Sequence, residues 1–151
     1  MFKHLVFVYG TLKKGEPNHY LIQPGSTSGK SILIGTGHTQ NKFPLVIATK
    51  YNIPYLLDAT GNGNVVTGEI YSVDQALLDN LDVLEDIPKH YQRRFEKIVL
   101  QECLLPERTD DFKYNAILNC WIYVCGNFKE ELLALPFLTC FSNETAGYIP
   151  P

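Results

Sequence analysis

One segment of this chain has the periodicity of an amphipathic α-helix, and shorter runs typical of β-strands surround it. Leucines stand at positions 77, 78, 81 and 84, and a helical wheel with about 100° per residue gathers them within an arc of about 120°. Asp74 precedes the pattern as an N-cap, and Pro88 follows it as a residue that ends helices. We therefore predict a helix over Asp74–Asp86, the only strongly helical segment of the sequence.

Runs of apolar, β-branched and aromatic residues predict strands on both sides of this helix. The first, Leu5–Tyr9, is continuously apolar, as in a strand buried on both faces. Further strands are predicted at Ile32–Gly37, Leu45–Thr49, Tyr55–Asp58, Val65–Val73, Arg94–Leu104 and Ala116–Cys125. Turn residues separate the runs, and the glycine-rich tetrad at 61–64 resembles a hairpin connection. Short helices are predicted near Pro17–Ile22 and over Lys129–Leu135. We therefore expect one α+β domain spanning residues 1–151, with a meander that curls into a small barrel.

Net charge, the N-terminal sequence and the cysteines indicate which classes of partner and which cellular compartment to expect. Thirteen basic against sixteen acidic residues give a formal net charge of −3, whereas a protein that binds nucleic acid needs a basic surface. The N-terminal apolar run is shorter than the 7–15 residues of a signal peptide and the roughly 20 of a membrane span. The four cysteines form no C-x-x-C pair, which favours free thiols. We expect a cytoplasmic monomer without nucleic-acid or membrane partners.

Motifs for cofactors and metals are absent or incomplete. Gly25–Ser31 is similar to a phosphate loop but has one residue too few between its glycines, and no buried strand precedes it. The glycines at 61, 63 and 68 do not form a dinucleotide fingerprint. The four histidines are scattered with no i, i+4 pair. The sequence therefore predicts no cofactor and no metal.

Glu85 is an acidic residue that the helical pattern places on the apolar face. It follows Leu78 by seven residues and Leu81 by four, so it shares their side of the helix. Its acidic neighbours on the helix lie outside the apolar arc, where they can be solvated: Asp79, Asp82 and Asp86. One carboxylate therefore points toward the core side.

Three interpretations of Glu85 are open at this point. The side chain can curl out to solvent past the last helical turn. It can form a structural ion pair with Arg93 or Arg94. It can also be a general acid/base in a dry pocket, where desolvation raises the pKa of a carboxyl group.

The second feature is the turn after the first predicted strand, Val8–Leu12. A buried strand that ends in Gly10 lets the chain turn with its amides exposed, since glycine accepts conformations that other residues resist. Successive exposed amides can bind an anion or an oxyanion. The alternative is an ordinary glycine turn after a core strand.

The residues around both features resemble a known family. The matching motifs are Val8–Gly15, Pro17–His19, Pro44–Ile47, Asn52–Leu57, Gly68–Asp74, Leu81–Asp82, Glu85, Pro88 and Tyr91–Arg93. In this order, over about residues 5–95, they resemble the gamma-glutamylamine cyclotransferases of the gamma-glutamylcyclotransferase-like superfamily. Beyond residue 95 the resemblance is one of element order, with little motif identity.

The resemblance implies an α+β fold with a small mixed β-barrel and flanking helices, and a lyase-type reaction that needs no cofactor. Family members cleave gamma-glutamylamines, typically gamma-glutamyl-epsilon-lysine from transglutaminase crosslinks, into 5-oxoproline and the free amine. The catalytic glutamate of the family falls on Glu85. The loop that cradles the substrate falls on Tyr9, Gly10, Thr11 and Leu12. Tyr91 is expected either to hydrogen-bond near the site or to be a core tyrosine.

Two other functions are compatible with these residues. The substrate can be a gamma-glutamyl amino acid or glutathione instead of a gamma-glutamylamine. The same barrel can also be a non-catalytic module that binds a small molecule, with Glu85 serving only to pair an arginine.

Overall fold

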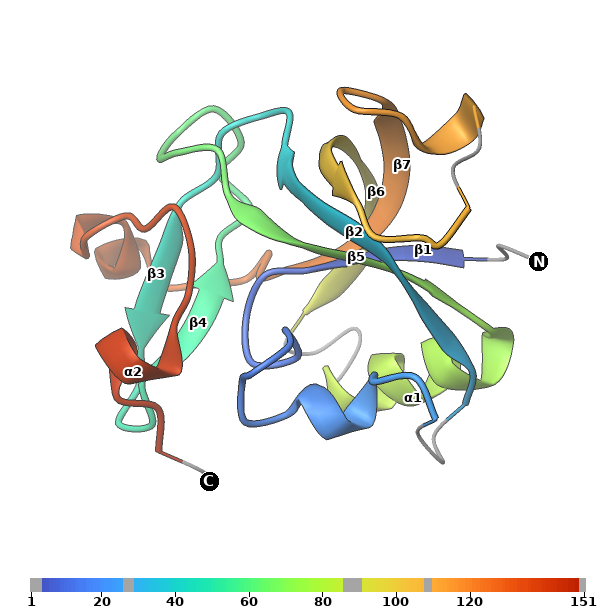
Figure 1. Ribbon diagram of the computed structural model, residues 1–151. Coiled ribbons are helices and arrows are strands. Elements are labelled where there is room, and N and C mark those ends of the chain that lie inside the picture. The colour runs from blue at the N-terminus through green and yellow to red at the C-terminus, as the bar shows by residue number, and fades with distance from the viewer. Residues whose placement is uncertain (1–3, 26–28, 86–90, 108–109, 150–151) are drawn as a thin grey trace.

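The computed structural model describes residues 4–25, 29–85, 91–107 and 110–149. Five strands form a closed barrel in the order β1-β5-β2-β6-β7 (Figure 1). They are β1 (His4–Val8), β2 (Ser31–Thr39), β5 (Thr67–Val73), β6 (Gln92–Cys103) and β7 (Ile117–Val124). The barrel closes through a parallel contact between β1 and β7, and its other neighbours are antiparallel. The α+β fold with a small mixed barrel is therefore confirmed.

The chain does not follow the expected meander. After β2 it leaves the barrel and forms a separate two-stranded sheet of β3 (Leu45–Ala48) and β4 (Ile53–Leu56). It then returns as β5, which lies between β1 and β2. The tetrad at 61–64 is not a hairpin connection, because the strands on either side of it belong to different sheets. It packs under Phe43 instead, and a Cβ on Gly63 would lie 2.3 Å from the Phe43 carbonyl oxygen.

The helix α1 (Gln75–Leu84) begins where the sequence predicted it. The Asp74 carboxylate accepts a hydrogen bond from the Leu77 N–H (2.9 Å), as an N-cap does. Three of the four leucines are buried in the core: Leu77, Leu78 and Leu81. The fourth, Leu84, is 46% exposed because the helix ends there. The prediction that Leu84 lies on the buried face is therefore wrong. The predicted helix end at 86–88 lies outside the described residues.

β1 and α1 have similar lengths, so their C-terminal ends lie at the same end of the barrel. β5 runs antiparallel to β1, so Val73 at its end lies beside His4 at the start of β1. The helix begins one residue later and runs back along the barrel (Figure 1). Ten helical residues extend about 15 Å, close to the roughly 17 Å covered by five strand residues. The residues that follow the two elements, Glu85 and Tyr9, consequently lie at the same end of the barrel.

The other predicted helices are short 3₁₀ helices. His19–Leu21 replaces the helix near Pro17–Ile22, and Glu130–Ala134 replaces the helix over Lys129–Leu135. Neither segment buries a residue of its own, so neither has the apolar face that stabilises a longer helix. In the described part of the chain no helix is long and apolar enough to cross a membrane.

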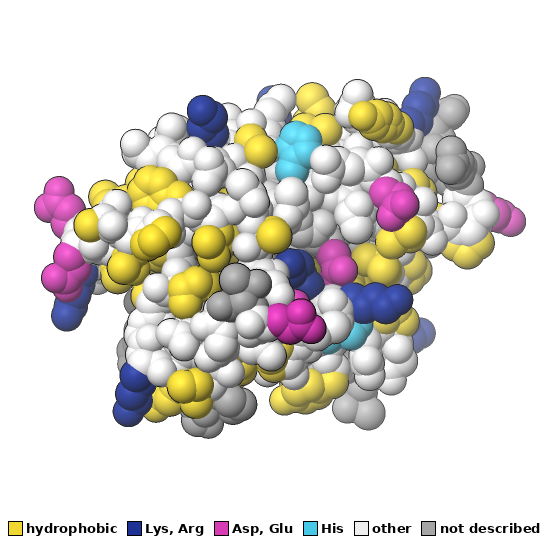
Figure 2. Space-filling view, turned by 60° about the vertical axis from the view of Figure 1, so that its left-hand side comes forward, with side chains coloured by type: hydrophobic (Ala, Val, Ile, Leu, Met, Phe, Trp, Pro, Cys, Tyr) yellow, Lys and Arg dark blue, Asp and Glu magenta, His cyan; other side chains and the backbone are white. Residues whose placement is uncertain are grey.

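The C-terminal segment lies along the small sheet and includes a short helix, α2 (Asn143–Ala146), that the sequence did not predict (Figure 1). The Leu138 N–H donates to the Leu45 carbonyl on β3 (2.8 Å). Lys13, in the loop after β1, donates through its Nζ to the Phe141 carbonyl (2.6 Å). This side of the molecule comes forward in Figure 2, which shows hydrophobic side chains gathered over it. The segment thus connects β3 with the loop that follows β1.

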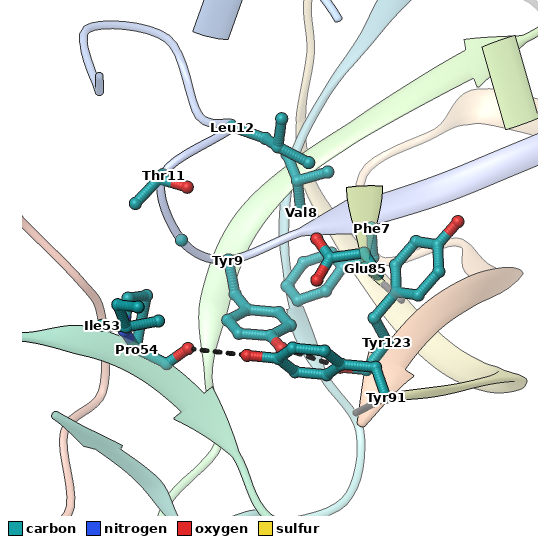
Figure 3. Close-up of a pocket in the computed structure, with 11 residues that line it drawn as sticks. Phe7, Val8, Tyr9, Thr11, Leu12, Ile53, Pro54, Glu85, Tyr91 and Tyr123 are labelled. Carbon is teal, nitrogen blue, oxygen red and sulfur yellow. Dashed lines mark hydrogen bonds between the residues drawn. The ribbon is translucent and has the colours of Figure 1, made fainter. Parts of the chain in front are cut away.

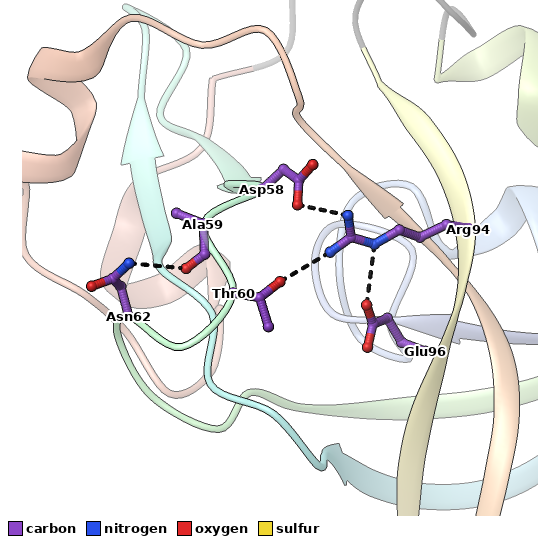
Figure 4. A network of polar contacts seen from close by, with 6 residues as sticks. All are labelled: Asp58, Ala59, Thr60, Asn62, Arg94 and Glu96. Carbon is purple, nitrogen blue, oxygen red and sulfur yellow. Dashed lines mark hydrogen bonds and ion pairs between the residues drawn. The ribbon is translucent and has the colours of Figure 1, made fainter.

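Arg94 on β6 joins the barrel to the loop that follows the small sheet (Figure 4). Its guanidinium contacts the Asp58 carboxylate at 2.6 Å and the Thr60 hydroxyl at 3.1 Å, both in that loop. Its Nε also pairs with Glu96 on its own strand at 3.1 Å. A planar guanidinium can make these three contacts together, whereas a lysine ammonium cannot match their geometry.

We predict that Arg94→Gln lowers the free energy of unfolding by about 1–2 kcal/mol, because three contacts to a charged group are lost. Arg94→Lys should recover less than half of this loss. Urea unfolding of both variants measures the effect, with Lys97→Gln, an exposed change on the same strand, as the control. An Arg94→Gln protein as stable as the control would show that the loop is held by other contacts.

Candidate active site

A pocket of about 80 Å³ opens at the end of the barrel where β1 and α1 finish (Figure 3). It is lined by Phe7, Val8, Tyr9, Gly10, Thr11, Leu12, Ile53, Pro54, Glu85, Tyr91 and Tyr123. All six residues that the sequence singled out lie in this lining. The structure therefore brings together the carboxylate of the helix and the turn of the first strand.

Glu85 immediately follows the last residue of α1, and its N–H donates to the Leu81 carbonyl (2.9 Å). The residue as a whole is half-buried, but its carboxyl group points into the pocket (Figure 3). Burial of this group raises the pKa of Glu85 from 4.5 to about 7. The interpretation that the side chain curls out to solvent is therefore wrong.

The arginine interpretation of Glu85 is also wrong. Arg93 pairs with Asp82 at 3.0 Å, and Arg94 pairs with Asp58 and Glu96. No ion pair of Glu85 occurs within the described ranges. Its carboxyl group is thus desolvated without a described counter-ion.

The Gly10 turn lies in the lining of this pocket, and three of its backbone amides are unbonded within the described residues. The Lys13 N–H donates to the Gly10 carbonyl (3.1 Å), which closes a tight turn. The N–H groups of Gly10, Thr11 and Leu12 have no acceptor in the described part of the chain. Three neighbouring donors remain available for a negatively charged group of a ligand.

Gly10 is needed here for a different reason from the one expected. Its φ is not in the left-handed region, so the turn does not need glycine for a positive φ. A Cβ at this position would instead lie 2.9 Å from Cγ of Pro54 on β4. The glycine lets β4 approach the turn closely enough to form one wall of the pocket.

Hydrogen bonds from the segment that follows the turn and from β5 hold the turn in place. Asn18 bonds twice to Thr11, through its N–H to the Thr11 carbonyl (2.9 Å) and through its amide to the Thr11 hydroxyl (3.0 Å). His19 donates through Nδ1 to the Leu12 carbonyl (2.9 Å). Glu69 on β5 accepts the Lys14 N–H (2.8 Å). These bonds hold the carbonyls of Thr11 and Leu12, so the peptide planes of the turn are fixed.

Three tyrosines complete the lining. Tyr9 donates its hydroxyl to the Tyr123 carbonyl (2.7 Å), and Tyr91 donates more weakly to the Pro54 carbonyl (3.4 Å; Figure 3). Burial raises the pKa of each of the three hydroxyls, so they stay neutral near pH 7. Tyr91 fits both expectations, since it is buried and also lines the pocket. Glu85 is thus the lining group whose charge changes near neutrality.

Sequence reasoning missed Tyr123 and the role of Asp82. Tyr123 lies in a predicted strand, and alternation places it on the face opposite Ile122 and Val124. Nothing local shows that this face meets α1. Asp82, expected to be solvated, instead accepts a hydrogen bond from the Tyr123 hydroxyl (2.7 Å) and pairs with Arg93.

A larger hollow of about 410 Å³ lies between β3 and the C-terminal segment. It is lined by Ile47, Pro136, Leu138, Cys140, Ser142 and Ala146. This lining has no carboxylate, histidine or basic group for proton transfer. Among the described residues, no cluster of three histidine, cysteine or acidic side chains is placed to hold a metal ion. The smaller pocket is therefore the candidate active site.

Known proteins share this sequence and fold. A family model described as gamma-glutamyl cyclotransferase, AIG2-like, matches residues 6–139. The gamma-glutamylaminecyclotransferase of Homo sapiens is 39% identical over 140 residues, covering 93% of this chain and 90% of the human protein. That of Mus musculus is 41% identical over 139 residues, covering 92% and 89%. A crystal structure of an AIG2-like protein from Mus musculus matches with a TM-score of 0.87 and 36% identity, covering 99% of this chain and 98% of the mouse chain. The chain thus belongs to the gamma-glutamyl cyclotransferase, AIG2-like family.

Proposed function

We propose that this protein is a gamma-glutamylamine cyclotransferase that converts gamma-glutamyl-epsilon-lysine and related gamma-glutamylamines into 5-oxoproline and the free amine. The observation that carries the proposal is the pairing, in one pocket, of a buried carboxyl group with a turn of free amides. The relatives named gamma-glutamylaminecyclotransferase support the substrate class. The family as a whole supports the reaction type.

The reaction needs no nucleophile from the protein, because the substrate carries one. The alpha-amine of a gamma-glutamyl group reaches its own gamma-carbonyl by closing a five-membered ring. Accordingly, the described pocket lining holds no serine, cysteine or histidine. The protein supplies a folded substrate conformation, a proton acceptor and donor, and a site for negative charge.

Glu85 performs both proton transfers in this scheme. Its carboxylate takes a proton from the alpha-ammonium, and the freed amine attacks the gamma-carbonyl carbon to form a tetrahedral oxyanion. Glu85 then returns the proton to the leaving nitrogen as the oxyanion re-forms the carbonyl and the amide C–N bond breaks. The second proton on the new ring nitrogen passes to the released amine, which departs as an ammonium ion, so the lactam nitrogen of 5-oxoproline keeps one hydrogen. A carboxyl group with a pKa of about 7 suits both steps, since it exchanges protons readily near neutral pH.

The Gly10 turn binds negative charge during this sequence. Gly10, Thr11 and Leu12 line the pocket, and their N–H groups have no acceptor among the described residues. They can hold the alpha-carboxylate of the substrate or the oxyanion of the intermediate. The three tyrosines exclude water from the opposite side, which strengthens these interactions.

We predict that Glu85→Gln folds normally and loses turnover by about 10²–10⁴-fold, because an amide cannot carry the proton. The measurement is release of 5-oxoproline from gamma-glutamyl-epsilon-lysine, with Glu102→Gln, an exposed change on β6, as the matched control. Undiminished turnover in Glu85→Gln would rule out the proton-transfer role. Parallel assays with a gamma-glutamyl amino acid and glutathione test the substrate, and preference for either would replace the gamma-glutamylamine.

The buried carboxyl also makes a prediction about stability. The pKa of Glu85 is raised in the folded protein. Between pH 4.5 and about 7 the folded protein therefore keeps a proton on Glu85 that the unfolded chain has released. Its contribution to stability is therefore present below pH 4.5 and is lost as the pH rises through about 7. The shift corresponds to about 3 kcal/mol at most.

Denaturant unfolding from pH 5 to pH 8 should show this loss in the wild type, and Glu85→Gln should lack that component. The variant should consequently gain stability relative to the wild type as the pH rises. An identical pH dependence in both proteins would mean that the carboxyl group is solvated in the fold.

A further inference from the structure

The placement of Glu85 depends on the last turn of α1. Its carboxyl group has no ion-pair partner in the described part of the chain, and its backbone bonds only to the turn before it. Of the apolar side chains in that turn, Leu81 packs into the core at 1% exposure, whereas Val83 is 79% and Leu84 is 46% exposed. The residues nearest Glu85 therefore lack apolar packing of their own, and helix ends of this kind fray readily. The end of the turn next to Glu85 therefore depends on a contact in addition to Leu81.

Asp82 supplies this contact. It lies three residues before Glu85, in the same turn, and its Oδ1 accepts the Tyr123 hydroxyl at 2.7 Å. The same oxygen pairs with Nε of Arg93 at 3.0 Å. The Arg93 guanidinium lies over the Trp121 ring at 4.1 Å, so the barrel side of the pair is itself fixed. Charge-assisted bonds of this kind are among the stronger side-chain contacts.

Tyr123 extends the connection to the other half of the pocket. Its hydroxyl binds Asp82 on α1, while its carbonyl accepts the Tyr9 hydroxyl at 2.7 Å. Tyr9 directly precedes the Gly10 turn. A continuous hydrogen-bonded chain thus runs from the helix that carries Glu85, through β7, to the turn that presents the amides.

A contribution to stability alone does not explain the ion pair of Asp82 and Arg93. Nη1 of Arg93 is buried and has no hydrogen-bond partner among the described residues. A buried donor without an acceptor lowers stability, and a partly buried ion pair is weak evidence for a net gain. The geometry favours a role in which position matters more than stability.

We propose that Asp82 is a positioning residue that, through Tyr123, holds the Glu85 carboxyl group at a fixed place relative to the amides of the Gly10 turn. This inference rests on the proposed function, because it concerns the geometry of that reaction. Misplacement of a reacting group by about 1 Å can cost about 100-fold in rate. Asp82 carries no proton in the scheme, and its described partners are Tyr123 and Arg93.

Two substitutions of Asp82 distinguish the effect of its hydrogen bonds from the effect of its negative charge. Asp82→Ala removes the acceptor for both Tyr123 and Arg93. Asp82→Asn keeps an oxygen in the same place, so it should preserve the hydrogen bonds while removing the charge. The control is Asp79→Ala on the same helix, because Asp79 is exposed and accepts only a local bond from Gln75 (2.8 Å).

The first experiment compares kcat and KM for gamma-glutamyl-epsilon-lysine, well below the unfolding temperature of every variant. We expect kcat of Asp82→Ala to fall about 10- to 100-fold with KM within about threefold of the wild type. Asp82→Asn and Asp79→Ala should stay within about threefold in kcat. Tyr123→Phe should lower kcat, and combining it with Asp82→Ala should cost little more than Asp82→Ala alone. Wild-type kcat in Asp82→Ala, or an equal fall in Asp82→Asn, would overturn the proposal.

A second experiment does not depend on turnover. If Asp82 holds Glu85 in its dry position, Asp82→Ala lets the carboxyl group reach water, and its pKa falls toward 4.5. The loss of stability between pH 5 and pH 8 should then be smaller in Asp82→Ala than in Asp82→Asn. Of the described groups around Glu85, the hydroxyls of Tyr9, Tyr91 and Tyr123 stay neutral in this range.

The two experiments distinguish the two proposals. A wild-type protein that releases no 5-oxoproline overturns the proposed function, while the pH dependence of unfolding still decides whether Asp82 positions Glu85. Equal pH dependence in Asp82→Ala and Asp82→Asn overturns the positioning role, whatever the turnover.

Discussion

The burial of one carboxyl group is the constraint on which the rest of the site depends. Desolvation alone raises the pKa of Glu85 to about 7, so its proton affinity is set by how well the surrounding residues exclude water. The closed barrel and the small sheet provide that shelter, since Tyr9, Tyr91 and Pro54 are buried around the pocket. A buried carboxyl group of this kind lowers stability at neutral pH.

The topology explains how two distant segments meet. The strand β5 is the neighbour of β1 and leads directly into α1, so the helix starts at one end of β1 and finishes at the other (Figure 1). The similar lengths of strand and helix then place Glu85 beside the residues that follow β1. Tyr123, on the other neighbour of β1, links the two through its hydroxyl and its carbonyl. The site is thus a consequence of which strands flank β1.

The sequence pattern predicted the features that depend on neighbouring residues, such as the helix and the first strand. It did not predict which strands pair or which distant residues come into contact. Helical periodicity placed Glu85 on the buried side, and the apolar run before Gly10 located the first strand and its turn. The strand order could not be predicted, because a separate sheet interrupts the sequence of barrel strands. For the same reason Asp82 was expected in solvent, since only the barrel brings Tyr123 to it. The need for glycine at position 10 comes from Pro54, a contact no periodicity reveals.

The most direct test of the account is a titration of the Glu85 carboxyl carbon by ¹³C NMR, compared with the pH dependence of kcat/KM for 5-oxoproline release. A single buried proton carrier predicts a midpoint near pH 7 in the spectrum and an acidic limb of the rate profile at the same pH. The signal that titrates is assigned by its absence from Glu85→Gln. A midpoint near 4.5, or a rate profile whose limb does not follow the titration, would contradict the central role of this carboxyl group.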